Sequence, residues 1–311
     1  MKIFKPKFWS TNHISFLSII LLPISIIIQL LLTFKKFFSK QVEFNIPVFC
    51  VGNIYLGGTG KTPISIKISQ ILVKQNKKPA IVKKFYKNQF DEVQLVKNNF
   101  KNIFIDISRI GAIHKAIDKN FNAVVLDDGF QDYSIKKTLN ILCFNQRQLI
   151  GNGLTIPSGP LRENLNSIRN CQIIVINGNR EKKFEDKIKR ISQKIKVFYC
   201  NYIPFNIPKI KNKRLLAFAG IGNPENFFDL LKKNNYKVKE KISFPDHYVY
   251  SKKDIKELTD MAKKNRLKLI TTEKDHHRLK KFGYEKNIFY LPIKVKFDKE
   301  KQFIKELKKY L

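Results

Sequence analysis

The segment that most constrains the fold is a glycine-rich turn between an apolar run and a helical pattern. Residues 48–72 read VFCVGNIYLGGTGKTPISIKISQIL. A short buried strand that turns directly into a helix is typical of parallel α/β proteins. Gly57, Gly58 and Gly60 leave backbone N–H groups free to wrap a phosphate, while Lys61 adds a cation. Thr62 supplies a hydroxyl for Mg²⁺ at the helix N-terminus, so the segment predicts a phosphate-binding loop.

This loop departs from the usual G-x-x-x-x-G-K-[ST] pattern at one position. Tyr55 stands where the first glycine is normally found. An ordinary glycine turn is the alternative, but it would not explain why Lys and Thr follow the glycines. We therefore expect residues 57–62, Thr59 included, to hold the phosphates of a nucleotide, with Lys61 also acting in catalysis.

Alternating strands and helices predict the rest of the nucleotide-binding domain, which we place at residues 41–205. Strand-like apolar runs are expected at Val48–Val51, Ala80–Val82, Ile103–Ile105, Ala123–Leu126, Ile141–Phe144 and Ile173–Ile176. Helical patterns at Thr62–Gln75 and Ile110–Lys119 lie between them. Such spacing indicates a P-loop NTPase-type fold, with a mostly parallel sheet and helices on both faces.

The run AVVLDDGFQD places Asp127 and Asp128 at the end of one of these strands. Parallel sheets bind ligands at the carboxyl ends of their strands. A carboxylate there can hold the Mg²⁺ of a nucleotide directly or through water. An ordinary turn is the alternative, and the upstream phosphate loop makes the metal role the better explanation.

An uncharged apolar segment precedes the nucleotide domain. Residues 14–34 read ISFLSIILLPISIIIQLLLTF, and lysines flank them on both sides. As one helix these 21 residues would be about 31 Å long, close to the hydrocarbon thickness of a bilayer. No small-x-small cleavage site follows, which disfavours a signal peptide. We therefore expect residues 1–40 to form a membrane anchor, while Pro23 and Gln29 leave open whether it crosses, kinks or re-enters.

A second, smaller α/β domain is expected over residues 206–311. The proline-containing stretch Tyr202–Lys213 is predicted to link the two domains. The expected elements are a strand at RLLAFAG, a helix over Pro224–Asn234, a strand over Lys237–Phe244, a helix over Ser251–Asn265 capped by Ser251, and strands at Leu267–Thr271 and Ile288–Val295.

Composition narrows the possible partners only slightly. The 60 Lys and Arg outnumber the 25 Asp and Glu, which gives a net charge of +35. Such a charge favours nucleic acid, phosphorylated ligands or anionic lipid, but no helix-turn-helix, zinc or RNP-type motif is present. The four cysteines include no C-x-x-C pair and are expected to be buried and reduced.

Six motifs in order give the chain a resemblance to the tetraacyldisaccharide 4′-kinase family of lipid A kinases. They are VGNIYLGGTGKTP, LDDGFQD, GNGLTIPSGPLRE (Gly151–Glu163), FAGIGNPENFF (Phe218–Phe228), FPDHYVY (Phe244–Tyr250) and TTEKD (Thr271–Asp275). The resemblance implies transfer of the ATP γ-phosphoryl group, with Mg²⁺, to the 4′-hydroxyl of a tetraacyl glucosamine disaccharide 1-phosphate. The product would be lipid IVA.

The resemblance also implies where the protein acts and with what. The expected partners are the lipid A disaccharide 1-phosphate and the anionic inner membrane, with the catalytic domains of a monomer on the cytoplasmic side and no specific nucleic acid. A membrane-tethered P-loop ATPase or GTPase without a lipid acceptor explains the phosphate loop but not the later motifs. A basic membrane-bound nucleic-acid-binding protein explains only the charge.

Residue roles follow from the matching motifs. Lys61 and Thr62 match the phosphate-loop pair of the family, and Asp127 and Asp128 match its Asp-Asp-Gly-x-Gln motif. In Pro-Leu-Arg-Glu, Arg162 is expected to bind phosphate and Glu163 to be a further metal-side carboxylate.

His247 matches the histidine of Phe-Pro-Asp-His, which in the family works with an acidic residue of the first domain. Asp91 is the candidate here, with Glu92 beside it. We predict that Asp91 accepts the 4′-hydroxyl proton while His247 orients it, and that domain closure brings the two together. His276 and His277 are expected to be a surface pair and not metal ligands.

The chain also departs from the family at two motifs. Lys84, Phe85 and Tyr86 replace the family's Arg-Gly-Tyr, and Lys cannot reproduce the Arg fork at a phosphate. Asp132 stands where the family often has His.

Overall fold

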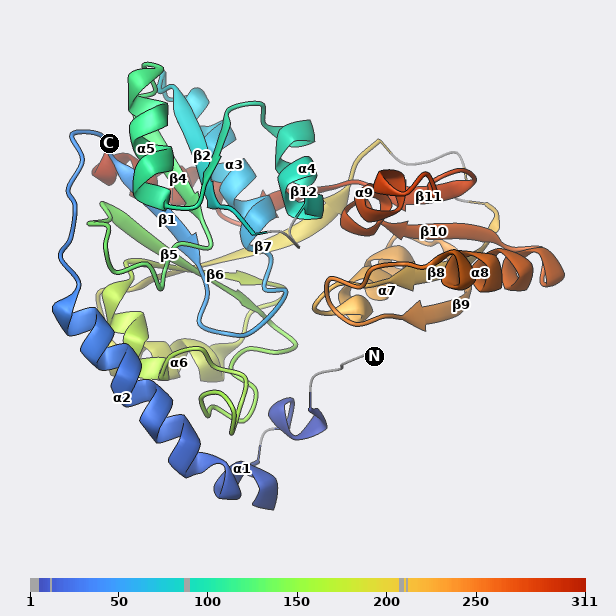
Figure 1. Ribbon diagram of the computed structural model, residues 1–311, viewed down its shortest axis with the longest axis horizontal. Helices are drawn as coiled ribbons and strands as arrows, with labels where there is room; N and C mark the ends of the chain where they lie inside the picture. The colour runs from blue at the N-terminus through green and yellow to red at the C-terminus, as the bar shows by residue number, and fades with distance from the viewer. Residues whose placement is uncertain (1–5, 12, 87–89, 207–209, 211) are drawn as a thin grey trace. The chain divides into compact units, whose positions relative to one another are not determined.

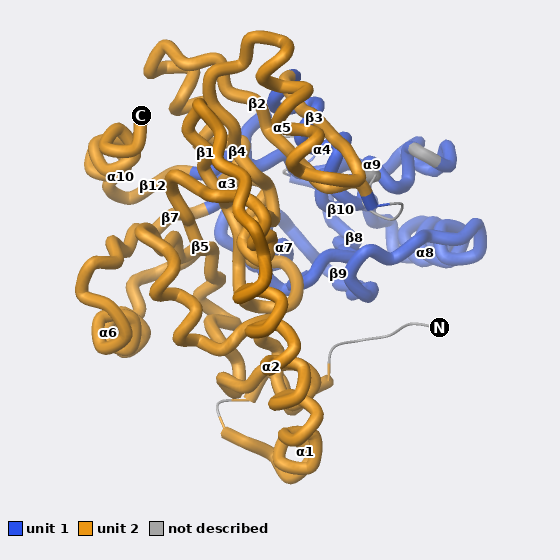
Figure 2. The backbone as a smooth tube through the Cα atoms, turned by 60° about the vertical axis from the view of Figure 1, so that its left-hand side comes forward, with its two compact units in different colours: residues 1–4, 86–101, 202–295 blue, residues 5–85, 102–201, 296–311 orange. Residues whose placement is uncertain are grey.

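The computed structural model describes residues 6–11, 13–86, 90–206, 210 and 212–311. The chain forms two compact units (Figure 2). The larger unit contains residues 5–85, 102–201 and 296–311, and the smaller contains residues 86–101 and 202–295. Two differences from the expected domains follow: residues 86–101 belong with the C-terminal unit, and the chain end returns to the nucleotide-binding unit.

The larger unit is built on an eight-stranded sheet (Figure 1). The strand order is β12-β7-β6-β5-β1-β4-β2-β3, and β1 pairs in parallel with both β4 and β5. The strands are β1 Val48–Gly52, β2 Pro79–Lys84, β3 Ile103–Asp106, β4 Ala123–Asp127, β5 Leu139–Asn145, β6 Ile173–Asn177, β7 Lys196–Pro204 and β12 Ile293–Phe297. The six strands expected in this domain are confirmed, whereas the sequence did not predict β7 or the membership of β12 in this sheet.

Helices cover both faces of this sheet. One face packs on Ile113 of α5 (Arg109–Asp118) and on Phe184 and Ile188 of α6 (Lys182–Ile191). The alternate strand residues, such as Phe49 and Val125, are also fully buried, as a parallel sheet requires. Helix α3 (Lys61–Val73) packs on β1, β2 and β4. The unit closes with α10 (Glu300–Leu307), and short 3₁₀ turns lie at Lys7–Trp9, Leu165–Asn170 and Lys308–Tyr310.

The smaller unit has a four-stranded parallel sheet in the order β11-β10-β8-β9. Its strands are β8 Arg214–Ala219, β9 Lys237–Ser243, β10 Lys268–Thr272 and β11 Ile288–Leu291, and its helices are α4 Phe90–Asn99, α7 Pro224–Lys233, α8 Lys252–Lys264 and α9 Glu273–Lys281. The expected cap of α8 is confirmed as a capping box between Ser251 and Asp254.

Two expected elements near this unit differ in the structure. The strand expected at Ile288–Val295 is two strands, β11 and β12, which belong to different sheets and are separated by Pro292. Proline lacks the N–H needed for a continuous ladder, which explains the break. The expected linker Tyr202–Lys213 begins inside β7, and its residues 207–209 and 211 lie outside the described residues.

The apolar N-terminal segment is two helices, α1 (Phe16–Ile20) and α2 (Leu22–Phe38), which meet at Leu21. The expected N-terminal membrane helix is not supported: within the described residues, no helix is both long and apolar enough to cross a bilayer. Pro23, in the first turn of α2, cannot donate the backbone hydrogen bond that a continuing helix needs.

The core of the smaller unit gives a direct test of this packing. Phe228 is fully buried among Leu215, Ala217 and Leu231. We expect Phe228→Ala to lower the free energy of unfolding by about 3–5 kcal/mol, because it removes a buried ring and leaves a cavity. Urea denaturation followed by circular dichroism would measure it. Phe282→Ala, at an exposed aromatic, is the control and should change stability little.

Candidate active site

The phosphate loop is shaped by one buried asparagine. The Asn53 side-chain amide donates to the carbonyl oxygens of Tyr55 at 2.6 Å and Gly57 at 3.2 Å, and to the Thr59 hydroxyl at 2.8 Å. Gly60, the N-cap of α3, has φ 88°, a conformation that glycine adopts without strain. The loop therefore keeps a fixed curve even though Tyr55 replaces its first glycine.

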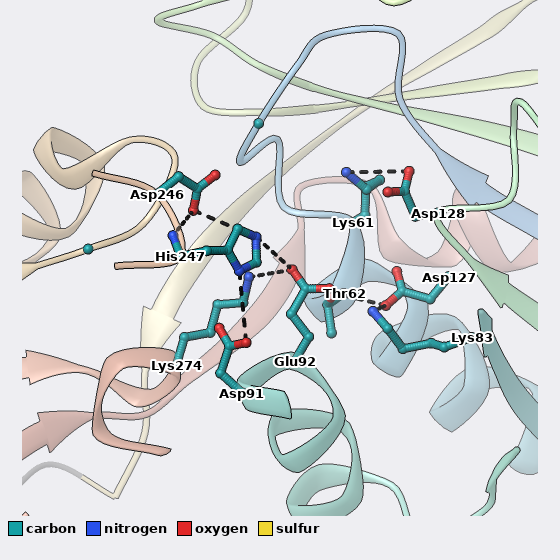
Figure 3. A network of polar contacts seen from close by, with 12 residues as sticks. Lys61, Thr62, Lys83, Asp91, Glu92, Asp127, Asp128, Asp246, His247 and Lys274 are labelled. Atoms are coloured by element: carbon teal, nitrogen blue, oxygen red, sulfur yellow. Dashed lines mark hydrogen bonds and ion pairs between the residues drawn. The ribbon is translucent and has the colours of Figure 1, made fainter. Parts of the chain in front are cut away.

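We use the name phosphate-loop cluster for Lys61, Thr62, Asp127, Asp128 and Arg162. The Lys61 ammonium lies 3.6 Å from Asp128 Oδ1, and Arg162 Nη1 donates to the same oxygen at 3.1 Å (Figure 3 shows the Lys61 contact). Two cations thus meet one carboxylate at the end of β4. The excess positive charge suits a phosphate, which Arg can bind through its planar fork.

Asp127 lies beneath this pair and is 1% exposed. Its carboxylate accepts hydrogen bonds from Thr62 at 2.9 Å, Ser65 at 3.1 Å and the buried ammonium of Lys83 at 2.6 Å. Three donors on one carboxylate leave it little capacity for a direct metal bond. Lys83 was not predicted as a site residue, because nothing in the sequence around it indicates that its ammonium group pairs with Asp127.

Glu163 has a different environment from the aspartates. Its Oε1 atom is buried and accepts no hydrogen bond. Burial, followed by the nearby Glu163 carboxylate, raises the pKa of Tyr133 well above its ordinary value. Within the described residues no three acidic, His or Cys side chains gather as a metal site.

A second group of polar residues lies within the smaller unit, and we call it the Asp91 cluster: Asp91, Glu92, His247, Lys274 and Arg278. Arg278 donates to Asp91 Oδ2 from Nε at 3.0 Å and from Nη2 at 2.7 Å. Burial alone would raise the pKa of Asp91, but the charges of Arg278, Lys274 and His247 lower it below 3.8. Asp91 is thus an ionised carboxylate with one oxygen fixed by arginine.

His247 faces the free side of this carboxylate. Its Nδ1 atom lies 3.9 Å from Asp91 Oδ1, and Nε2 lies 3.9 Å from Glu92 Oε1 (Figure 3). These distances are too long for hydrogen bonds, and the buried Nδ1 atom has no hydrogen-bond partner. Lys274 Nζ donates a hydrogen bond to Glu92 Oε1 at 2.6 Å. The imidazole, about a third of whose side chain is exposed, thus lies beside two carboxylates that are each paired with a cation.

The expectation that Asp91 and His247 come from different domains is wrong. Helix α4, which carries Asp91, packs on α9 of the smaller unit. The Asp91–Arg278 and Glu92–Lys274 pairs join these helices. Lys274 and Arg278 are four residues apart on α9 and so share one face, a spacing that could have indicated an acidic partner helix.

The two neighbouring histidines also differ from expectation. His277 is buried beside Asn98 of α4, with 3.2 Å between Nε2 and Nδ2, and the centroid of the His276 ring lies 4.3 Å from the centroid of the Tyr290 ring. Burial, followed by the neighbouring His277, lowers the pKa of His276 to about 4. They are packing residues of α9 and not a surface pair, and they belong to no metal site among the described residues.

Asp91 gives a pH-dependent prediction. Because its folded pKa lies below 3.8, its stabilisation is complete above that value and disappears as pH falls through the lower folded pKa. Asp91→Asn should therefore lower the free energy of local unfolding of α4 by about 3 kcal/mol at about pH 7. Hydrogen exchange of the α4 amides would measure this. A deficit that stays undiminished at the lowest pH, where Asp91 is neutral, would contradict the ion-pair explanation.

Known proteins resemble this chain along almost its whole length. The Tetraacyldisaccharide-1-P 4′-kinase family matches residues 17–102 and 90–311. The tetraacyldisaccharide 4′-kinase of Pelagibacter ubique is 44% identical over 99% of this chain and 98% of its own length. That of Rickettsia bellii is 33% identical over 90% of each. A crystal structure of LpxK from Aquifex aeolicus in complex with ATP has a TM-score of 0.70 and 26% identity, covering 94% of this chain and 99% of that one. This chain belongs to the tetraacyldisaccharide-1-P 4′-kinase family.

Proposed function

We propose that this protein transfers the γ-phosphoryl group of ATP to the 4′-hydroxyl of a tetraacyl glucosamine disaccharide 1-phosphate, which yields lipid IVA. The observation that carries the proposal is the phosphate-loop cluster, where Lys61 and Arg162 converge on Asp128 in a chain of this kinase family. The acceptor follows from the names of the relatives.

The loop residues 57–62 would bind the ATP phosphates through backbone N–H groups, with Lys61 against the β- and γ-phosphates. Thr62 and Asp128 would hold Mg²⁺ together with the nucleotide, with the orphaned oxygen of Glu163 as a further ligand. Asp127, occupied by three donors, would act through water. When bound, Mg²⁺ neutralises charge that develops on the transferred group.

The Asp91 cluster supports a change in the proposed roles of Asp91 and His247 in proton transfer. Asp91 is 1% exposed and fixed by Arg278, whereas about a third of the His247 side chain is exposed. A carboxylate with a lowered pKa is a weak proton acceptor. We therefore assign proton acceptance from the 4′-hydroxyl to His247, and to Asp91 the orientation and stabilisation of the resulting imidazolium.

The N-terminal helices support attachment to the face of a membrane, not a span across it. Ser18 and Ser25 are buried against the protein, while Phe16, Ile27 and Phe37 are exposed. A helix with polar residues inward and apolar residues outward suits the interface of a bilayer. Lys35, Lys36 and Lys40 near its end suit anionic lipid, which fits the cytoplasmic side of a bacterial inner membrane.

The phosphoryl transfer is tested with the purified full chain, ATP, Mg²⁺ and the detergent-solubilised disaccharide 1-phosphate. We expect the wild type to form the 4′-phosphorylated lipid, and Lys61→Ala to lose at least about 100-fold in rate, because transition-state charge loses its cation. Lys115→Ala removes an exposed lysine of the same unit and is the control. ADP release without lipid phosphorylation would instead support a nucleotide hydrolase.

Membrane attachment is tested by flotation with vesicles that contain anionic lipid. Phe34→Ser combined with Phe37→Ser should weaken vesicle binding by tenfold or more, because each change removes roughly 2 kcal/mol of apolar transfer. Phe282→Ser, at an exposed aromatic of the smaller unit, is the matched control. Equal binding of both variants would exclude α2 as the lipid contact.

A further inference from the structure

Helix α2 has a polar inward face that the membrane role alone does not explain. Ser25 is 2% exposed, and its hydroxyl donates to the Thr155 carbonyl oxygen and bonds to the Ser158 hydroxyl at 2.8 Å. The backbone N–H of Ser158 donates back to Ser25 Oγ at 3.1 Å. Contact with lipid would be served by an apolar side chain at this position. The hydroxyl instead joins α2 to the loop of residues 155–164, which we call the clasp loop.

Gln29 lies one helical turn after Ser25 and bonds to the end of the clasp loop that carries Arg162 and Glu163. Its side-chain amide donates to the Arg162 carbonyl oxygen at 3.2 Å and accepts from the Asn164 N–H at 3.3 Å. These two peptide groups flank Glu163. The side-chain amide of Gln29 therefore bonds to the backbone on both sides of Glu163. These bonds restrict the peptide groups next to Arg162, which is proposed to bind phosphate, and Glu163, which is proposed to bind Mg²⁺.

The other side of the clasp loop contacts the phosphate loop. The Arg162 N–H donates to the Ile54 carbonyl oxygen at 2.6 Å, and the Leu56 N–H donates to the Pro160 carbonyl oxygen at 2.8 Å. The Arg162 side chain then reaches Asp128. A continuous chain of hydrogen bonds thus runs from α2 through the clasp loop to the phosphate-loop cluster, entirely within the larger unit.

We propose that Ser25 and Gln29 are positioning residues for phosphoryl transfer, which tie the phosphate contact of Arg162 to the helix that rests on the membrane. The lipid side of this statement rests on the proposed function. The link from Gln29 to Arg162 rests on the hydrogen bonds, and the phosphate contact of Arg162 rests on the proposed nucleotide site. The helix that attaches the protein to lipid is also the support against which Arg162 and Glu163 are aligned, so the nucleotide site is built on the membrane-facing element.

The test measures binding of a non-hydrolysable ATP analogue with Mg²⁺ by calorimetry. Gln29→Leu leaves the outward face of α2 intact and removes both clasp bonds. We expect it to weaken analogue binding about tenfold, with unchanged vesicle flotation and melting temperature. In an Arg162→Ala background, Gln29→Leu should weaken analogue binding by less than about twofold, because the Arg162 side chain that Gln29 positions is already absent. Thr33→Val, which loses only a bond within α2, is the control and should bind normally.

Three results would overturn the proposal: normal analogue binding by Gln29→Leu, equal losses with and without Arg162, or weaker binding that follows a lower melting temperature. If Gln29→Leu does not fold, Ser25→Ala is carried through the same cycle. The readout is separate from phosphoryl transfer. A wild type that binds the analogue but does not phosphorylate the lipid would refute the proposed function and leave this test intact.

Discussion

The carboxylate of Asp127 is the contact on which the nucleotide-binding unit depends. It ends β4 and is bonded by Thr62 and Ser65 of α3 and by Lys83 of β2, so it joins α3 to two neighbouring strands. A buried charge is costly unless its partners satisfy it, and three donors do so here. The same bonds direct the Thr62 hydroxyl and set the start of α3, where phosphate would bind. The hydrogen bonds of Asp127 therefore both stabilise the sheet and fix the geometry of the phosphate loop.

Local sequence signals predicted the sheet well because its strands are short apolar runs between helical patterns. They did not predict the position of α4. Its residues give a weak pattern in which Asp91 and Glu92 begin the helix, and chain order places it between two strands of the larger sheet. Two salt bridges join it to Arg278 and Lys274 of α9, almost two hundred residues away in the sequence. The four-residue spacing of Lys274 and Arg278 on α9 is the one local signal, and it does not identify which segment carries the acidic partners.

The apolar N-terminal segment shows a second limit of sequence reasoning. Its length and lack of charge are those of a spanning helix. Three polar positions, Ser18, Ser25 and Gln29, carry the contrary information, since they fall on one side and meet hydrogen-bond partners in the folded protein. Hydropathy averaged over the segment hides such a stripe. In this structure the stripe turns toward the protein, so the apolar residues are left to face outward.

The charge of +35 can now be related to particular residues. In the phosphate-loop cluster, Lys61 and Arg162 meet a single carboxylate, and that local excess is what suits a phosphate. The Asp91 cluster is the opposite case, because Asp91 and Glu92 are each matched by a cation of α9. Most other lysines are solvent-exposed, where screening limits each contribution. In the proposed function, binding of the nucleotide phosphates therefore depends on a few oriented cations, while the net charge supplies only a general attraction to anionic surfaces.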